Sequence, residues 1–293
     1  MIQVKDLSKV YSNGKGVFDL DFQVAEGEVF GFLGPNGAGK TTTIRMLLGF
    51  TNPTKGSSTI NGLDARTKTE EIQKFLGYVP GETAFFDNMT GTEFLTFIRK
   101  MRGFNGKNRE KELIQRFELD AKGRIRKMSK GMKQKLGLVA AFMNDPSVLI
   151  LDEPTSGLDP LMQKRFIEMI LEEKKRGKTI LMSSHLFDEV ERTCERTAII
   201  REGILVTKER IDELKKTLKK TYIITLKEAS DLERIDNSGL QYSSLENLKI
   251  KIEIGEDYQT LFSVLSECSV ADLDVQKKTL EDIFLKYYSK EDA

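Results

Sequence analysis

The sequence predicts an α/β fold with a mostly parallel core sheet, followed by a small α+β appendage. Two apolar runs, at 29–33 and 147–151, lack polar alternation, as strands buried on both faces do. Helical patterns alternate with these and other strands, which is typical of a parallel sheet covered by helices. After Val206 the composition changes to a lysine-rich stretch. We therefore expect a first domain at 1–206, a connector helix at 207–220 and a small α+β domain at 221–293.

The individual elements follow from local periodicity and turn residues. Alternation puts Phe18, Leu20 and Phe22 on one face of a strand, and Asn61-Gly62 is a hairpin signal. Expected strands in the first domain are 2–4, 17–24, 29–33, 57–60, 77–80, 147–151, 178–182 and 198–200. Expected helices are 43–49, 69–76, 92–101, 109–119, 131–143, 161–175, 187–194 and 208–220. In the last domain we expect strands at 222–226, 248–254 and 270–275 and helices at 258–266 and 280–288.

Composition limits the classes of protein to which the chain can belong. Its 293 residues carry a net charge of +1, so no overall field favours nucleic acid, and no nucleic-acid partner is expected. Lysine and arginine cluster at 122–135, which we interpret as a solvated or partner-facing surface. Cys194 and Cys268 show no metal-ligand spacing, as in a reduced cytosolic protein. No signal peptide begins the chain and no apolar run approaches the ~20 residues that span a bilayer, so any membrane role must depend on a partner.

A glycine-rich loop lies between an apolar strand and a helix, and the rest of the domain is organised around it. Glycines let successive backbone N–H groups point at one anion, and the start of the helix adds its positive dipole end. Lys40 would place a cation on the β- and γ-phosphates, and the Thr41 hydroxyl would ligate Mg²⁺. This order of elements predicts a phosphate-binding P-loop for a nucleoside triphosphate. Its expected nucleotide-binding residues are Gly34, Pro35, Asn36, Gly37, Ala38, Gly39, Lys40, Thr41 and Thr42.

Two carboxylates follow the buried strand at 147–151. Asp152 suits a second Mg²⁺ anchor, usually through ordered water. Glu153 suits a general base for water, a role worth about 10²–10⁴-fold in rate. An Asp-Glu pair can also be a helix cap, but a P-loop ~110 residues upstream favours the catalytic interpretation. Tyr11, before the first turn, is either a packing residue or an aromatic that stacks on adenine.

Further motifs give the chain a family resemblance. The stretch Met128-Ser129-Lys130-Gly131-Met132-Lys133-Gln134-Lys135 resembles the signature motif of ATP-binding cassette (ABC) ATPases. Ser156-Gly157-Leu158-Asp159 resembles the D-loop of that family. His185, the one histidine in the chain, falls at the position of the family's switch histidine, and Tyr11 matches its adenine-stacking aromatic. The resemblance covers residues 1 to about 206.

The resemblance implies a P-loop NTPase cassette with an antiparallel β subdomain and a helical subdomain at about 84–143. Its cofactors would be ATP and Mg²⁺, and His185 would orient the γ-phosphate and water beside the base Glu153. The cassette would close head to tail on a second copy, whose ATP it contacts through Ser129, Lys130, Gly131 and Met132. The helical subdomain would dock a permease; Phe85, Phe86 and Met89 are either anchors for that contact or ordinary core residues.

Two positions depart from the family pattern. Gly81 stands where glutamine is usual, so no side chain there can ligate Mg²⁺ or sense the γ-phosphate. Glu82 follows it, and we treat the two as a loop of uncertain role. Lys130 stands where the common signature has glycine, but Ser129 and Gly131 remain, so we expect the motif to function.

A single cassette without a membrane span resembles the separate ATPase subunit of bacterial exporters. The signature variant and the stretch 280–288 resemble the bacitracin-type and phenol-soluble-modulin-type subgroup, which moves peptides, antibiotics and other amphipathic cargo. We expect ATP hydrolysis coupled to transport at the cytoplasmic face of the membrane, with a permease in another chain and a second ATPase subunit as a homodimer or heterodimer. The alternative is an ABC-type ATPase that acts on ribosomes or nucleic acid. A P-loop kinase or GTPase is disfavoured by the signature motif and by the lack of a guanine-specific stretch.

Overall fold

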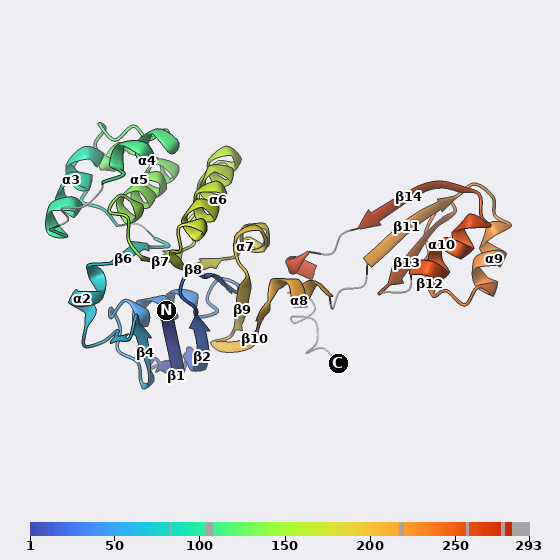
Figure 1. The fold of residues 1–293 in the computed structure, drawn as a ribbon, viewed down its shortest axis with the longest axis horizontal. Coiled ribbons are helices and arrows are strands. Elements are labelled where there is room, and N and C mark those ends of the chain that lie inside the picture. Colours follow the sequence, from blue (N-terminus) through green and yellow to red (C-terminus); the bar gives the residue numbers. More distant parts are fainter. Residues whose placement is uncertain (83, 104–107, 217–219, 256–257, 277–278, 283–293) are drawn as a thin grey trace. The chain divides into compact units, whose positions relative to one another are not determined.

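The computed structural model describes residues 1–293 except 83, 104–107, 217–219, 256–257, 277–278 and 283–293 (Figure 1). Its contacts divide the chain into two units, Met1–Arg210 and Ile211–Ala293. We describe each unit separately. No helix within the described ranges is long and apolar enough to cross a membrane.

The core of the first unit is a sheet of order β10-β9-β3-β8-β7-β6. Strands β6, β7, β8, β3 and β9 pair in parallel, whereas β10 pairs antiparallel with β9. Because the first five are parallel, their carboxyl ends lie at one edge, where ligands bind in open α/β sheets. The strands are β3 (Val29–Leu33), β6 (Leu76–Val79), β7 (Val148–Asp152), β8 (Thr179–Ser184), β9 (Arg196–Arg201) and β10 (Ile204–Arg210).

A second, antiparallel sheet has the order β2-β1-β4-β5. Its strands are β1 (Ile2–Val10), β2 (Gly16–Val24), β4 (Lys55–Ile60) and β5 (Leu63–Asp64). The Asn61-Gly62 turn joins the last two, with Ile60 opposite Leu63, as the hairpin signal predicts. Phe22 stacks on Phe30 and Phe32 at centroid distances of 5.6 and 5.3 Å, so the two sheets share one hydrophobic core.

Helices cover the core sheet, and α3, α4 and α5 lie together as a helical part (Figure 1). Side-chain caps start several of them: Thr90 and Glu93 form a capping box, and Asp159 accepts a hydrogen bond from the Met162 N–H. The helices are α1 (Lys40–Leu47), α2 (Thr69–Gln73), α3 (Gly91–Met101), α4 (Glu110–Arg116), α5 (Lys130–Phe142), α6 (Pro160–Lys175) and α7 (Phe187–Thr193), with a 3₁₀ turn at Ile125–Lys127.

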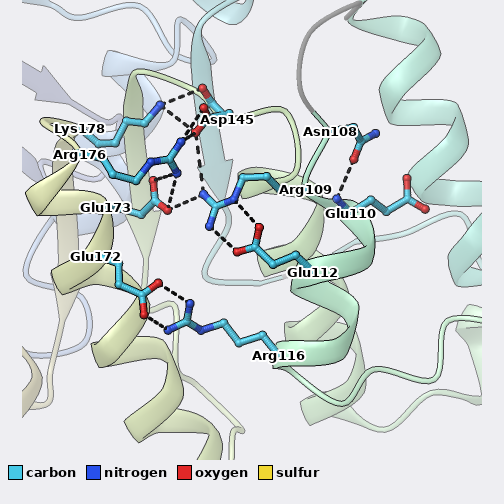
Figure 2. A network of polar contacts seen from close by, with 10 residues as sticks. All are labelled: Asn108, Arg109, Glu110, Glu112, Arg116, Asp145, Glu172, Glu173, Arg176 and Lys178. Carbon is cyan, nitrogen blue, oxygen red and sulfur yellow. Dashed lines mark hydrogen bonds and ion pairs between the residues drawn. The ribbon is translucent and has the colours of Figure 1, made fainter.

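A network of charged side chains ties α4 to α6 and to the segments that flank β7 and β8 (Figure 2). Arg109, only 7% exposed, donates to Glu112 at 2.8 Å and to the buried Glu173 at 2.5 Å. Arg176 donates to Glu173 and Asp145, and Lys178 pairs with Asp145 at 3.0 Å. We call these six residues, Arg109, Glu112, Asp145, Glu173, Arg176 and Lys178, the α4–α6 network. Each charge in it has at least one opposite partner.

The second unit contains an antiparallel sheet of order β12-β13-β11-β14. Isoleucine and leucine side chains from β11, β13 and α10, including Ile224, Ile252 and Leu261, form its buried core. Its elements are α8 (Ile211–Lys216), β11 (Lys220–Leu226), α9 (Asp231–Asn237), β12 (Tyr242–Ser244), β13 (Lys249–Ile254), α10 (Tyr258–Ser266) and β14 (Val270–Gln276).

Several predicted elements need correction. The connector helix expected at 207–220 is wrong at both ends, because 207–210 belong to β10 and Lys220 begins β11; among the described residues of this range, Ile211–Lys216 is helical. The first strand extends to Val10 rather than ending at residue 4, and the helix expected at 69–76 ends at Gln73. The sequence patterns did not predict α9 or β12. Most of the helix expected at 280–288 lies outside the described residues.

Candidate nucleotide-binding site at the carboxyl edge of the core sheet

The glycine-rich loop connects β3, which ends at Leu33, to α1, which begins at Lys40. Gly37 and Gly39 have φ values of 82° and 114°, a region that costs other residues steric strain. A Cβ on Gly34 would lie 2.4 Å from the Ile200 carbonyl oxygen, so this glycine is also required by close packing. No side chain caps α1, so its first-turn N–H groups remain available to an anion.

Lys40 is buried in this loop with its ammonium group turned inward. Its Nζ donates to the carbonyl oxygens of Gly34 at 2.5 Å and Pro35 at 3.2 Å. The same nitrogen lies 3.1 Å from Oε1 of Glu153. One cation is therefore shared between the loop backbone and the carboxylate expected to act as the base.

Asp152, the last residue of β7, is fully buried and held by two hydroxyl groups. Thr41 Oγ1 donates to Oδ2 at 2.8 Å, and Ser183 Oγ donates to Oδ1 at 2.5 Å. The structure thus brings together Thr41 and Asp152, the two residues expected to hold Mg²⁺, although they are 111 positions apart. Ser183, which the sequence patterns did not single out, orients the carboxylate from the neighbouring strand.

Glu153 and His185 contact each other directly. His185 Nδ1 lies 2.5 Å from Oε2 of Glu153, and their side chains are 51% and 17% exposed. Glu153 has φ 49°, so its backbone leaves the strand in the left-handed conformation, which is costly for a residue with a Cβ. Within the described part of the chain, its other oxygen, Oε1, is buried and accepts no hydrogen bond, although Lys40 is close. This carboxylate retains capacity to accept a proton or a donor.

A cavity of about 220 Å³ opens over the loop. Tyr11 lines it, 40% exposed, with the Lys9 ammonium 5.7 Å from its ring centroid. The aromatic side chain is therefore at the site and presents a face to which a flat base could stack. The cavity is lined by Tyr11, Lys15, Gly16, Pro35, Asn36, Gly37, Gly39, Lys40, Thr41, Thr42 and Glu153.

Comparisons with known proteins establish the family of this chain. The family model for ABC transporters matches residues 17–156, which include the glycine-rich loop and Asp152-Glu153. The chain is 41% identical over 209 residues to the bacitracin transport ATP-binding protein BcrA of Bacillus licheniformis, covering 70% of this chain and 68% of that protein. It is 32% identical over 302 residues to the linearmycin resistance ATP-binding protein LnrL of Bacillus subtilis, covering 97% of each chain.

The chain belongs to the ABC transporter family. A solved ATP-binding cassette, described as a dimer in a post-hydrolysis state with ADP and phosphate, superposes with a TM-score of 0.66 at 20% identity, over 72% of this chain and 98% of that one. This match shows the shared fold, with a mostly parallel core sheet, an antiparallel sheet and helices, as predicted. The family resemblance is thereby confirmed: the protein is an ABC transporter ATPase, which binds and hydrolyses ATP.

The signature segment begins α5 and touches the D-loop of the same cassette. Ser129 caps the helix by accepting a hydrogen bond from the Met132 N–H at 3.2 Å. A Cβ on Gly131 would lie only 2.7 Å from the Gly157 carbonyl oxygen. The methylenes of Lys130 lie over Gly157, within 3.1 Å of the position that a Cβ would take there. Lys130 is exposed, and the packing of its methylene groups on Gly157 positions it, since no ion pair holds its ammonium group within the described part of the chain.

The other D-loop residues divide between structure and surface. Leu158 is buried in the core, and Asp159 is the N-cap of α6. Ser156 instead lines a second cavity of about 690 Å³ with Asp152, His185 and Lys130. Of the four, Ser156 therefore has the clearest access to the site.

The loop of uncertain role, Gly81 and Glu82, lies beside Asp152, the carboxylate expected to hold Mg²⁺. A Cβ on Gly81 would lie 3.2 Å from Oδ2 of Asp152, and Glu82 lines the second cavity. Burial and then the charge of Asp152 raise the pKa of Tyr78, in the same cavity, to about 12, so its phenol stays protonated. With glycine at position 81, this wall of the cavity is formed by Tyr78, Pro80, Gly81, Glu82 and Ala84.

Two further residues support the site: Gln134, which the sequence patterns placed in the signature segment without a role, and Glu189, which they did not single out. Gln134, 2% exposed, reaches from the signature helix to donate to the Pro154 carbonyl oxygen at 2.7 Å. Glu189 of α7 accepts hydrogen bonds from Thr155 and Ser184. Their positions next to recognised motifs were the available signals, but their contacts depend on the three-dimensional fold.

Proposed function

We propose that this ATPase is the energy-supplying subunit of an exporter, in which two cassettes close around ATP and drive a permease carried by a separate chain. The observation that supports it most is the full-length similarity to a linearmycin resistance protein, together with the higher identity to a bacitracin transport protein. By this analogy the cargo is a peptide, an antibiotic or another amphipathic molecule.

The loop and the carboxyl edge have the donors that MgATP requires. The phosphates would be held by the backbone of 34–42, by Lys40 and by the first turn of α1, and Tyr11 would stack on adenine. Thr41 and Asp152 would hold Mg²⁺, since hydroxyl and carboxylate oxygens are the ligands it prefers. The existing contact between Thr41 Oγ1 and Asp152 Oδ2 supports this role, because both oxygens already converge on one point.

In hydrolysis, Glu153 would accept a proton from the attacking water. His185 contacts it through Nδ1 and so keeps the other ring nitrogen for a phosphate oxygen or the water. The strained backbone of Glu153 and its buried Oε1, which lies near the Lys40 ammonium but accepts no hydrogen bond within the described residues, support an assignment as base, since such features gather at functional sites.

A second cassette would complete each site. Ser129 and Lys130, which are exposed, and Gly131 and Met132, which are half-buried, form a helix start that would contact ATP held by the partner, with Ser156 of the D-loop nearby. Closure would then depend on the γ-phosphate, because its loss removes the contacts between copies. A homodimer suffices, because one chain carries both halves of the composite site.

The permease contact would come from the helical part, at the cytoplasmic face of the membrane. Phe86 is 54% exposed and packs edge-on against Phe97, whereas Phe85 packs against the buried Phe94. Phe86 is therefore the better candidate anchor, and Phe85 is better explained as a core residue.

One experiment tests the exporter role. The tagged chain is purified from solubilised membranes of its own cells, and partners are identified by mass spectrometry. A polytopic membrane protein, at a fixed ratio to the ATPase, is expected. Recovery with ribosomes or nucleic acid instead would overturn the proposal in favour of an ABC-type ATPase that acts on those targets.

A second experiment tests the composite site. Glu153→Gln should keep ATP affinity, slow hydrolysis by about 10²–10⁴-fold and trap an ATP-bound dimer, because the base is lost while the phosphate contacts remain. Size-exclusion chromatography with and without ATP measures the dimer. A variant that stays monomeric with ATP, or that hydrolyses it at the normal rate, would contradict the assignment.

A further inference from the structure

The carboxylate of Glu189 connects the two chain segments that carry the proposed reacting groups. Its Oε1 accepts a hydrogen bond from Thr155 Oγ1, and its Oε2 accepts one from Ser184 Oγ at 3.0 Å. Thr155 is two residues after Glu153, and Ser184 immediately precedes His185. All three contact residues are 3% exposed or less, so water cannot replace either hydrogen bond.

The sheet does not by itself hold these segments together. Strand β7 ends at Asp152 and β8 at Ser184, so Glu153 and His185 both lie beyond the last paired residues. The last backbone hydrogen bond between the two segments runs from the Glu153 N–H to the Ser183 carbonyl oxygen at 3.1 Å. Apart from the contact between Glu153 and His185 themselves, the side chain of Glu189 links the residues that follow Glu153 to the end of β8.

We propose that Glu189 is a positioning residue for ATP hydrolysis: its carboxylate holds the turn after Glu153 and the strand end before His185 in register, so that base and histidine stay in contact. This inference rests on the proposed roles of Glu153 and His185. It assigns no contact between Glu189 and the nucleotide, and therefore predicts an effect on turnover rather than on ATP affinity.

Two acceptor oxygens are what this position requires. Ser184 Oγ accepts a hydrogen bond from the Leu186 N–H at 2.9 Å and has its own proton to donate, for which Glu189 Oε2 at 3.0 Å is nearer than the Leu186 carbonyl oxygen at 3.4 Å. A carboxylate can accept from Ser184 and Thr155 together, whereas an amide offers one acceptor and one donor group. Glu189→Gln keeps the shape of the side chain but mismatches one of the two hydroxyls.

The test measures kcat and ATP affinity of the full chain separately. Glu189→Gln should lower kcat by about 10- to 100-fold, as expected for misplaced reacting groups, with ATP affinity within about twofold of the parent. Thr155→Val, which is isosteric but lacks the hydroxyl, should lower kcat in the same way, and Thr155→Ser should restore it. The double variant Glu189→Gln/Thr155→Val should lose little more than either single change, because the two residues act as one unit.

Glu173→Gln is the matched control, since Glu173 is equally buried but lies in the α4–α6 network. It should lower the melting temperature without lowering kcat of the folded protein. A normal kcat for Glu189→Gln, or parallel losses of kcat, ATP affinity and stability as for a general folding defect, would overturn the inference. If Glu153→Gln is also fully active, the proposed function fails first; if only Glu153→Gln is inactive, the positioning role alone fails.

Discussion

The site cluster of Lys40, Asp152, Glu153 and His185 and the α4–α6 network both combine carboxylates with nitrogen-bearing side chains. The charged groups are paired differently in the two. In the network, Arg109, Arg176 and Lys178 each meet a carboxylate, and Glu173 receives two arginines (Figure 2). At the nucleotide site, Lys40 relies partly on backbone carbonyls, and Oε1 of Glu153 accepts no hydrogen bond within the described residues.

This difference separates a structural cluster from a functional one. Charges that neutralise each other completely have nothing left for a ligand, and removing one of them leaves another buried and unpaired. Charges that are incompletely paired cost stability but can bind phosphate or move a proton. Substitutions in the network should therefore change stability, and substitutions at the site should change binding or turnover.

The largest effect is expected from Arg109→Met. It keeps much of the aliphatic volume but leaves Glu112 without its guanidinium partner and the buried Glu173 with Arg176 alone, so unfolding free energy should fall by about 3–5 kcal/mol. Urea denaturation followed by circular dichroism measures it. Under conditions where the variant is folded, its ATP affinity should equal that of the parent; a selective loss of ATP binding would break the comparison.

Lys40→Ala should have the opposite pattern to Arg109→Met: weaker ATP binding with little change in stability. ATP affinity should fall by about 100-fold or more, because a charge-assisted contact to the phosphates is lost, while the denaturation midpoint changes little. Titration calorimetry with MgATP gives the affinity. Lys178→Ala is the control, since it removes a lysine from the network and should leave binding intact. Retained affinity in Lys40→Ala would show that the ammonium is structural.

The network should also make the fold sensitive to acid. Hydrogen bonding to Arg109 lowers the pKa of Glu112. Burial alone would raise the pKa of Asp145, but Lys178 and Arg176 outweigh it, and the net pKa is lowered. Stability from both carboxylates is thus complete above their ordinary pKa values near 4 and lost as the pH falls below them. In Asp145→Asn, the unfolding free energy should decrease less between pH 5 and pH 3 than in the parent. An equal decrease in both proteins would show that Asp145 does not contribute to the acid sensitivity.

The smallest effect is expected from Arg116→Ala. Arg116 pairs with Glu172, whose side chain is 52% exposed, outside the buried part of the network. Exposed pairs contribute about 0.2–1 kcal/mol, so the denaturation midpoint should move far less than in Arg109→Met. A loss as large as that of Arg109→Met would mean that pairing, rather than burial, sets the stability of this cluster.

Local patterns predicted the elements that support the site because a strand, a turn and a helix start each have a short-range signal. Strand β3 and helix α10 have their predicted bounds, and the glycine-rich loop and Asp152 lie where strand ends were expected. The connector helix was predicted wrongly because the charged residues Lys208, Glu209 and Arg210 hid the strand character of β10, and pairing with β9 outweighed helix propensity.

Long-range pairing has no such signal. Arg109 meets Glu173 across 64 positions, and a single sequence reads both as members of solvated helix faces. Thr155, in the turn after β7, and Ser184, at the end of β8, likewise show nothing unusual in the sequence. Their shared partner, Glu189, becomes evident only in the folded structure. The identity of motif residues was therefore predictable, whereas the supporting contacts around them were not.

The approach of Gly131 to Gly157 has a mechanical consequence. The Gly131 backbone lies directly against the Gly157 carbonyl oxygen, and the Lys130 methylenes lie over Gly157, so the start of the signature helix and the D-loop have little room to slide independently. We therefore expect a displacement of one segment to displace the other. Gly131→Ala should push the two segments apart and weaken this coupling without altering any charge.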